Sequence, residues 1–331
     1  MAERDYALIF ALDKYGDTEK WRTLKGAIND ADRFNRWLLG PAAVPKTHII
    51  EEVGDDSGTR PQLSDLMAKV MDLLRAQPSG ARIGRRLYIF LAGHGVEAID
   101  QARLETLLVT AESRDNWVQG FPGNLAMSHF RLEARFEEII LFMDCCRTMS
   151  AEARPSWNIP TTPDALAKSV RWGSALAAQL FTDVRERKVS GKMQGIFTSA
   201  LMDGLEGKAK DGEGRITTES LSSYLYETLK GEERPDIHFP FSITFIDGKG
   251  ANGGNSAVLT LPELPAGMTL VIRHGKTFEQ VPADPKPQAL GGLSVMLPAF
   301  GTYLVELLND NGSVHRQVPV VLKSDSVHVT F

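Results

Sequence analysis

The sequence predicts an α/β fold in which a mostly parallel sheet, flanked by helices, is followed by a small C-terminal β-sandwich. Two observations support this prediction. Over residues 1–247, short apolar runs alternate with segments of helical periodicity, which is typical of a parallel sheet covered on both faces. Beyond residue 257, apolar and polar residues alternate one by one, which is typical of antiparallel strands with one buried face.

Three apolar runs are the expected central strands: residues 6–12, 87–92 and 139–143. None of them shows the alternation of apolar and polar residues that is typical of a strand with one solvent-exposed face, so we expect them to be buried on both faces. A shorter strand is expected at residues 48–50, and alternating residues predict another at 241–245. Binding and catalytic residues of such sheets lie beyond the carboxyl ends of the strands.

Amphipathic helices are expected between these strands. Residues 24–39 and 63–74 carry apolar side chains at spacings of three and four, as one buried helix face requires. Two further helices are expected at residues 195–205 and 221–229. Residues 148–194 lack a clear period and contain three prolines, so we expect a long, partly mobile connection there.

A segment rich in glycine and asparagine, residues 247–256, marks the expected domain boundary. It separates a first domain, residues 1–247, from an accessory domain, residues 257–331. The accessory domain contains about six alternating runs, and Asn-Asp-Asn-Gly at 309–312 predicts a hairpin turn between two of them. Such a series of short antiparallel strands indicates a β-sandwich.

The overall composition excludes several classes of protein. With 43% hydrophobic and 24% charged residues, the 331-residue chain has the composition of an ordinary globular protein. A net charge of −5 gives no electrostatic reason for binding to nucleic acid or to an anionic membrane. No apolar run approaches the roughly 18 residues of a membrane span, and the first residues have no apolar core of signal-peptide length, so we expect a cytoplasmic protein.

The two cysteines of the chain, Cys145 and Cys146, are neighbours in the sequence. Adjacent cysteines form a strained and rare disulfide, and two cysteines without nearby histidines make a poor zinc site. A thiol with a chemical role is therefore one interpretation. The alternative is that both are small apolar residues buried at a strand end.

His94 and Cys146 each closely follow an apolar strand. His94 stands in Gly-His-Gly after residues 87–92, and Cys146 stands in Asp-Cys-Cys-Arg after residues 139–143. Because neighbouring strands lie about 4.8 Å apart, residues just beyond the same edge of the sheet can meet. A cysteine thiolate and an imidazole suffice as nucleophile and base for acyl transfer, with the Gly95 and Cys146 amides as candidate donors to the oxyanion.

This pair and its surroundings resemble the caspase and metacaspase clan of cysteine peptidases. In that clan the catalytic histidine ends an apolar strand in His-Gly, and the catalytic cysteine follows a second strand about 50 residues later. Residues 24–31 are similar to the metacaspase segment after the first strand, and residues 195–201 are similar to the start of the small-subunit helix. The resemblance covers roughly residues 5–247 and implies a caspase-like sheet and an endopeptidase that works through a thioester acyl-enzyme.

The resemblance also implies individual roles. Metacaspases carry Asp-x-Cys and caspases carry their cysteine before Arg-Gly, so both patterns place the nucleophile at Cys146, with His94 as base. Cys145 is then expected to be buried; a reactive Cys145 beside a packed Cys146 is the alternative. In metacaspases the corresponding aspartates line an acidic pocket, which maps to Asp30 and Asp144 and implies cleavage after Arg or Lys. The alternative for Asp30 is that a helix N-terminus simply favours a carboxylate.

Clan members often mature by self-cleavage, which the resemblance implies for the segment 148–194. Basic residues of that segment are the candidate cleavage sites: Arg154, Arg171, Arg185, Arg187, Lys188 and Lys192. The alternative is a solvated basic loop. No cofactor and no metal are expected, although metacaspases often need calcium. The candidate calcium ligands are acidic residues in two turns: Asp55, Asp56, Asp211 and Glu213.

The expected partners follow from the same resemblance. We expect a protein substrate, no nucleic-acid or membrane partner, and an accessory domain that binds substrate or a regulator. One hypothesis is that the peptidase activates an effector in bacterial defence or cell death. Another is a catalytically inactive caspase-like scaffold that acts through its β domain.

Overall fold

The computed structural model describes residues 2–54, 60–78, 80–100, 103–177, 186–189, 191–248, 256–262, 264–265, 267–274, 280, 286–287, 292–298, 302–321 and 326–328. Backbone contacts divide the chain into two compact units: residues 1–209 with 221–243, and residues 210–220 with 244–331. The domain limits 1–247 and 257–331 stay a prediction, because residues 249–255 between them lie outside the described ranges.

A six-stranded sheet forms the centre of the first unit, in the order β13-β9-β7-β3-β1-β2. All neighbouring strands are parallel except β13, which runs antiparallel to β9. The predicted α/β class with a mostly parallel sheet is therefore confirmed. The strands are β1 (Asp5–Ala11), β2 (Ile49–Val53), β3 (Gly84–Gly93), β7 (Phe136–Cys145), β9 (Arg171–Leu176) and β13 (Asp236–His238).

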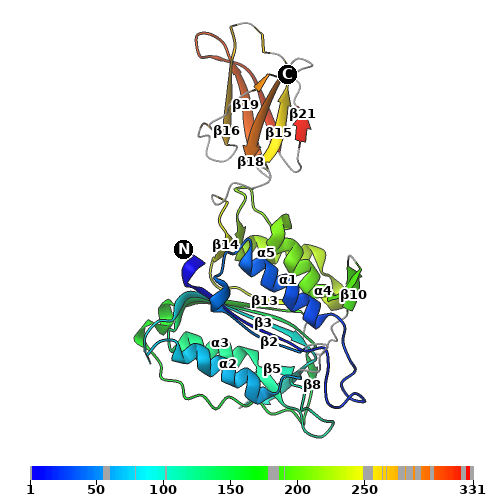
Figure 1. Ribbon diagram of the computed structural model, residues 1–331. Coiled ribbons are helices and arrows are strands. Elements are labelled where there is room, and N and C mark those ends of the chain that lie inside the picture. Colours follow the sequence, from blue (N-terminus) through cyan, green and yellow to red (C-terminus); the bar gives the residue numbers. More distant parts are fainter. Residues whose placement is uncertain are drawn as a thin grey trace. The chain divides into compact units, whose positions relative to one another are not determined.

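The three predicted apolar runs correspond to β1, β3 and β7, which are buried along almost their whole length. Figure 1 shows the reason, since helices cover both faces of the sheet. One face carries α1, α4 and α5, and the other carries α2 and α3. The helices are α1 (Ala27–Leu39), α2 (Leu63–Arg75), α3 (Gly123–Leu132), α4 (Ile196–Asp203) and α5 (Thr218–Thr228).

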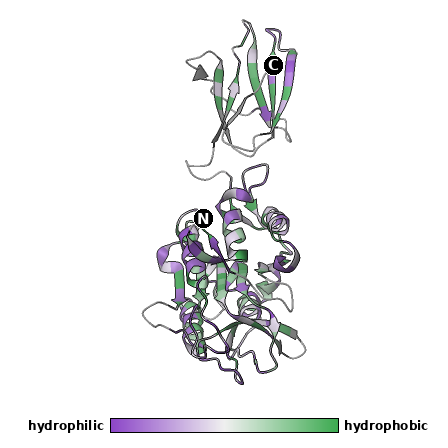
Figure 2. Ribbon diagram, turned by 90° about the vertical axis from the view of Figure 1, so that its right-hand side faces the viewer, coloured by the Kyte–Doolittle hydropathy of each residue, from purple (hydrophilic) through white to green (hydrophobic). Residues whose placement is uncertain are grey.

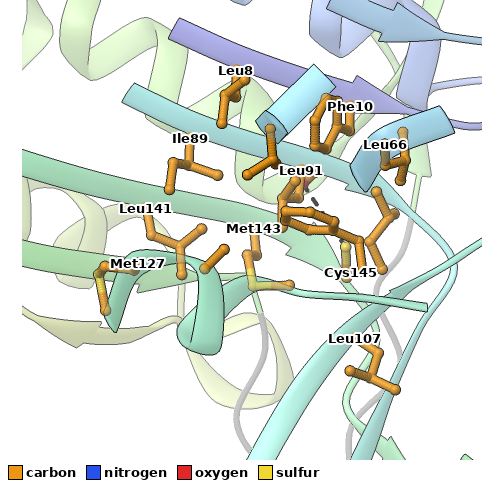
Figure 3. Packing of buried hydrophobic residues seen from close by; sticks show 14 of the residues in the cluster. Leu8, Phe10, Leu66, Ile89, Leu91, Leu107, Met127, Leu141, Met143 and Cys145 are labelled. Atoms are coloured by element: carbon orange, nitrogen blue, oxygen red, sulfur yellow. Dashed lines mark hydrogen bonds between the residues drawn. The ribbon is translucent and has the colours of Figure 1, made fainter. Parts of the chain in front are cut away.

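Apolar side chains of the helices fill both faces of the sheet. On one face, Phe34 of α1 stacks on Phe90 of β3 with ring centroids 4.6 Å apart. On the other face, Leu66 of α2 shares a core with Leu8 of β1 (Figure 3), and Val70 of α2 belongs to the same core. Burial of each large apolar side chain contributes about 1.5–3 kcal/mol. The helical spacing seen in the sequence therefore holds these helices on the sheet.

A second sheet, in the order β6-β5-β4-β8, begins where β3 ends. β4 starts at Gly95, directly after His94, and pairs antiparallel with β5. The sequence prediction missed this hairpin, because charged residues interrupt its apolar positions. Its strands are β4 (Gly95–Asp100), β5 (Arg103–Val109), β6 (Gly120–Pro122) and β8 (Thr148–Met149).

The prediction of a long connection over residues 148–194 is wrong. This segment contributes β9 to the central sheet and an antiparallel hairpin of β10 (Glu186–Val189) and β11 (Lys192–Gly195). The sequence of β9 contains no apolar run, because two of its buried positions are a glycine and a serine. Gly173 packs against the ring of Phe239, and Ser174 is buried. Its extended conformation comes from pairing with β7, which no local pattern records.

Short elements complete the first unit, and one pair of short strands, β12 and β14, belongs to the second. The strand expected at 241–245 begins only at Thr244, where β14 pairs with β12. The remaining elements are the 3-10 helices Ala2–Arg4, Lys46–His48, Ala165–Ser169 and Gly231–Glu233, the π turn Gly204–Lys208, and the strands β12 (Ile216–Thr217) and β14 (Thr244–Ile246).

The second unit contains two further sheets, β17-β18-β15-β21 and β16-β19-β20. Leu259 and Val295 of the first sheet share one hydrophobic core with Ile272, Val305 and Val320 of the second, as in a β-sandwich. Figure 2 shows hydrophobic and hydrophilic residues mixed along these strands. The strands are β15 (Ser256–Leu261), β16 (Thr269–His274), β17 (Lys286–Pro287), β18 (Leu293–Pro298), β19 (Thr302–Leu308), β20 (Val314–Val321) and β21 (Ser326–His328).

The predicted hairpin turn at 309–312 joins β19 to β20. Gly312 donates its backbone N–H to the Asn309 carbonyl at 2.8 Å. Gly312 has a φ of 77°, a left-handed conformation that glycine adopts without strain. Among the described residues, no helix combines the length and the apolar character needed to cross a membrane.

Candidate active site

Strand register brings His94 and Cys146 to corresponding positions. β3 pairs Gly93 with Cys145, and β4 pairs Val96 with Thr148. Both pairs are 52 residues apart in the sequence, and so are His94 and Cys146. His94 lies between Gly93 and Val96, and Cys146 lies between their partners Cys145 and Thr148. The two residues therefore occupy matching positions where the central sheet ends and the second sheet begins.

The glycines on either side of His94 are required by the backbone and by close packing. Gly93 has a φ of 149°, which side chains of L-residues rarely allow. A Cβ atom on Gly95 would lie 2.5 Å from the carbonyl oxygen of Cys146. The Gly-His-Gly sequence thus lets the backbone at Cys146 approach the chain that carries His94.

Two residues that the sequence analysis did not identify hold His94. The Tyr15 hydroxyl accepts the backbone N–H of His94 at 2.8 Å, and it donates to the Leu12 carbonyl at 3.1 Å. Nε2 of His94 lies 2.7 Å from the carbonyl oxygen of Arg22. Because a carbonyl oxygen only accepts, Nε2 carries the proton in the neutral ring, and Nδ1 is the nitrogen that can take up a proton.

Aromatic rings enclose the imidazole. The rings of Tyr15 and Trp21 have centroids 4.9 Å and 5.6 Å from that of His94. Burial raises the pKa of Tyr15 well above its ordinary value, so this side chain stays a neutral phenol that orients the histidine backbone. No local signal in the sequence connects Tyr15 or Arg22 with His94, since 79 and 72 residues separate them.

The two cysteines have different environments. Cys145 is buried, and its Sγ lies 3.8 Å from the Leu91 carbonyl among hydrophobic side chains (Figure 3). Burial, together with the charge of Asp144, raises the pKa of Cys145 well above that of an ordinary thiol. Cys146 is partly exposed and lines a hollow with His94. A thiol that stays protonated is a poor nucleophile, so Cys145 is unsuited to attack a substrate. Cys146, which lines the hollow, is therefore the candidate nucleophile.

Asp30 and Asp144 converge on Gly195 from different elements. Asp30 lies on α1, and its Oδ2 accepts the backbone N–H of Gly195 at 2.9 Å. Asp144 lies near the end of β7, and its Oδ2 accepts the backbone N–H of Thr198 at 2.9 Å and the hydroxyl at 2.6 Å. Any side chain at residue 195 would collide with the Asp144 carboxylate, so glycine is required there.

Each of these carboxyl groups keeps one buried oxygen, Oδ1, that has no hydrogen-bond partner among the described residues. Burial, with a smaller effect of the neighbouring Asp144 charge, raises the pKa of Asp30 well above its ordinary value. Burial also raises the pKa of Asp144 to about 6, against the opposing effect of the two Thr198 hydrogen bonds. A buried carboxylate with an unpaired oxygen is costly unless a donor or cation completes it.

Glu186 is a third carboxylate of this site, and the sequence analysis missed it. It stands at the start of β10, lines the same hollow, and its Oε1 accepts the backbone N–H of Lys25 at 3.0 Å. Its charge contributes to the raised pKa of both Asp30 and Asp144. In the sequence Glu186 stands among basic residues, and only the fold of the β10-β11 hairpin brings it to the site.

The hollow has a volume of about 370 Å³. It brings together every predicted site residue, His94, Gly95, Cys146, Asp30 and Asp144. Its full lining comprises Glu19, Lys20, Trp21, Arg22, Leu24, Ala27, Asp30, Gly93, His94, Gly95, Asp144, Cys146, Thr148, Glu186 and Gly195. A thiol, an imidazole and backbone amides beside a group of carboxylates are suited to acyl transfer from a substrate that carries a positive charge.

Arg147 fixes the chain just after Cys146. Its guanidinium donates to Glu97 of β4 at 3.1 Å and to Asp236 of β13 at 2.6 Å. Glu97 is buried and also accepts the hydroxyl of Thr106 at 2.8 Å. This buried pair ties the segment that carries Cys146 to the strand that follows His94.

The described residues contain no group of three histidine, cysteine or acidic side chains placed to hold a metal ion. Of the candidate calcium ligands, Asp55 and Asp56 lie outside the described residues. The Asp211 carboxylate accepts hydrogen bonds from the backbone and the guanidinium of Arg215. Glu213 forms an ion pair with the same arginine.

Comparison with known proteins finds no matching family model and no matching curated protein. Among solved structures, the chain is similar to the crystal structure of caspase-1 from Spodoptera frugiperda, with a TM-score of 0.47 and 12% sequence identity. The match covers 74% of this chain and 92% of that chain. This likeness concerns the course of the backbone, and the chemistry of the site depends on its own residues.

Proposed function

We propose that the protein is a cysteine endopeptidase that cleaves polypeptides after Arg or Lys. The observation that carries this proposal is one hollow that holds a thiol and an imidazole beside two carboxyl groups with unpaired oxygens. The sequence resemblance to the caspase and metacaspase clan points to the same chemistry. The protein acts in the cytoplasm without a resident cofactor, and calcium activation belongs to the proposal as a point to test.

Cys146 and His94 divide the chemistry. His94 takes the thiol proton at Nδ1, and the sulfur of Cys146 attacks the carbonyl carbon of the scissile bond. The amides of Gly95 and Cys146 donate to the oxyanion of the tetrahedral intermediate. His94 then returns the proton to the leaving amine, which leaves a thioester. Water, deprotonated by His94, hydrolyses this thioester and releases the free enzyme.

The acidic end of the hollow selects the residue before the scissile bond. A guanidinium carries several N–H donors in one plane, and it can complete the unpaired oxygens of Asp30 and Asp144 together. A lysine ammonium offers a point charge without this geometry. Glu186 adds negative charge beside the pair. We therefore expect Arg to be preferred to Lys, and both to be strongly preferred to Asp.

The test compares the wild-type protein with Cys146→Ala on three fluorogenic peptides that end in Arg, Lys or Asp. Wild type should cleave the Arg peptide fastest, and the variant should cleave none. Equal rates for the two proteins would exclude the mechanism, and preference for Asp would exclude the acidic pocket. Selective alkylation of Cys146 by iodoacetamide separates an active peptidase from a scaffold that acts through its β domain, because a scaffold needs no reactive thiol.

Self-processing is a second part of the proposal. Arg171 lies in β9 and is paired with Glu138, so the favoured sites are exposed residues outside the central sheet. These sites are Arg154, Arg187, Lys188 and Lys192. Arg185 lies outside the described residues. Intact-mass spectrometry should show cleavage after one of these residues in wild type, and an unchanged chain in Cys146→Ala incubated in parallel.

The biological setting is proposed from the same activity. The peptidase would activate an effector protein in bacterial defence or cell death, and its β-sandwich would bind the substrate or a regulator. Mapping of new protein N-termini after induction should reveal cleavage sites preceded by Arg or Lys. The same mapping with Cys146→Ala provides the control, and an unchanged set of N-termini would contradict the role.

A further inference from the structure

A second hollow adjoins the first. It has a volume of about 950 Å³, and Glu19 lines both hollows. Its walls come from the segment after β1, from the residues just before α2, and from the loop between β5 and β6. The lining residues are Gly16, Asp17, Thr18, Glu19, Arg60, Gln62, Ala111, Glu112, Ser113, Arg114, Asn116 and Trp117. None of the predicted site residues lies in it.

The chain segments that line the second hollow also reach His94. Gly16 donates its backbone N–H to the Ala111 carbonyl at 2.8 Å, and the segment that carries Gly16 continues to Arg22, whose carbonyl lies 2.7 Å from Nε2 of His94. Two residues before Ala111 in the chain, Val109 donates its backbone N–H to the His94 carbonyl at 2.9 Å. The two chain segments that line the second hollow at Gly16 and Ala111 thus also contact His94, one at its ring through Arg22 and the other at its backbone through Val109.

The proposed reaction indicates which part of the substrate lies near the second hollow. In the proposed reaction His94 passes its proton to the leaving amine, so the polypeptide downstream of the scissile bond must pass beside His94. The basic residue upstream lies in the pocket of Asp30 and Asp144. The second hollow, which shares Glu19 with the first, is therefore on the route of the leaving segment.

Trp117 lines this hollow. The residue is 51% exposed, although tryptophan is usually well buried. The loop that carries it is tightly held, because Arg114 and Trp117 exchange two backbone hydrogen bonds of 2.9 Å and 3.2 Å. The Ser113 hydroxyl braces the same loop through the carbonyl and the N–H of Gln119. A rigid, exposed aromatic ring loses little conformational entropy when a partner packs on it.

We propose that this second hollow binds the substrate polypeptide on the C-terminal side of the scissile bond, with an aromatic or large apolar side chain packed on Trp117. This inference rests on the proposed peptidase function and adds a second specificity site to it. Cleavage should depend on residues that follow the bond as well as on the basic residue that precedes it.

The experiment uses three substrates with the same upstream sequence ending in Arg. One is a simple methylamide, which places no side chain beyond the scissile bond, and two are extended by a short peptide that carries either Phe or Ala in its first positions. We expect wild type to prefer the Phe peptide over the Ala peptide by about tenfold in kcat/KM. Trp117→Ala should abolish this preference and leave cleavage of the methylamide within about twofold.

Leu166→Ala is the matched control, because Leu166 is 53% exposed and lines neither hollow. It should retain the preference for Phe. Persistence of the preference in Trp117→Ala would overturn the inference, as would an equal loss of activity toward all three substrates. The second result would assign Trp117 a structural role.

A binding measurement separates this inference from the proposed function. Titration calorimetry of Cys146→Ala with the two extended peptides needs no catalysis. Tighter binding of the Phe peptide, lost in the double variant with Trp117→Ala, supports the second site even if wild type cleaves nothing. Equal affinity for both peptides refutes the site, whereas failure to cleave the methylamide refutes only the peptidase proposal.

Discussion

Replacement of Asp144 by asparagine should make the protein more stable and less active. The amide keeps the shape of the side chain, and its oxygen can still accept both hydrogen bonds from Thr198. It removes a buried negative charge whose Oδ1 has no partner among the described residues. The charge of Asp144 therefore lowers the free energy of unfolding of the free protein, whereas it would favour binding of a positively charged substrate.

The magnitude follows from the pKa. Burial raises the pKa of Asp144 from 3.8 to about 6, so the folded state holds this proton more tightly than the unfolded chain does. Stability is therefore lost as the pH rises from about 4 through about 6, and the loss is complete above that range. This pKa difference of about two corresponds to a loss of about 3 kcal/mol in the free energy of unfolding. Asp144→Asn should recover a large part of this free energy at pH 8 and almost none at pH 4.

The effect on cleavage has the opposite sign. A hydrogen bond to a charged group is worth about 1.5–3 kcal/mol, so kcat/KM for an Arg peptide should fall by about 10- to 100-fold. The assays are urea denaturation at pH 4 and pH 8 and steady-state kinetics at pH 8. Asp203→Asn is the control, because hydrogen bonds from Lys208 and Arg33 lower the pKa of Asp203 despite its partial burial. That variant should lose stability at pH 8. If Asp144→Asn also loses stability at pH 8, or cleaves Arg peptides normally, the reasoning about the acidic pocket is wrong.

Three further substitutions test other parts of the site. Cys145→Ala should keep peptidase activity within a few-fold and cost about 1–2 kcal/mol in urea denaturation, since it removes one buried sulfur; loss of activity would point to Cys145 as the nucleophile. Glu186→Gln should raise KM for Arg peptides about two- to fivefold with little change in kcat, and an unchanged KM would remove Glu186 from the pocket. Glu97→Gln leaves the buried Arg147 short of a counter-charge, so denaturation should show a loss of about 3 kcal/mol; unchanged stability would mean that this pair does not hold the segment after Cys146.

The central strands of the sheet, and the position of His94 and Cys146 at their carboxyl ends, were predictable from the order of residues alone. The runs that form β1, β3 and β7 are apolar because both faces of each strand are covered, and this requirement acts on every residue of the run. His94 and Cys146 follow two of these runs, so the rule for parallel strands was enough to place them at one edge. Asp30 and Asp144 came from the family resemblance, and the structure brings both to the same hollow.

The groups that surround these residues could be identified only once the chain was folded. Tyr15 and Arg22 hold His94 across more than 70 residues of sequence, and Glu186 reaches the carboxylates from a hairpin that has no periodic pattern. β9 was mistaken for part of a connection because its strand conformation comes from pairing with β7. A hydrogen bond or an ion pair between distant segments needs only one donor and one acceptor in the right place. A single donor or acceptor produces no repeating pattern in the sequence. A buried face requires a whole series of apolar residues, and that series can be recognised in the sequence.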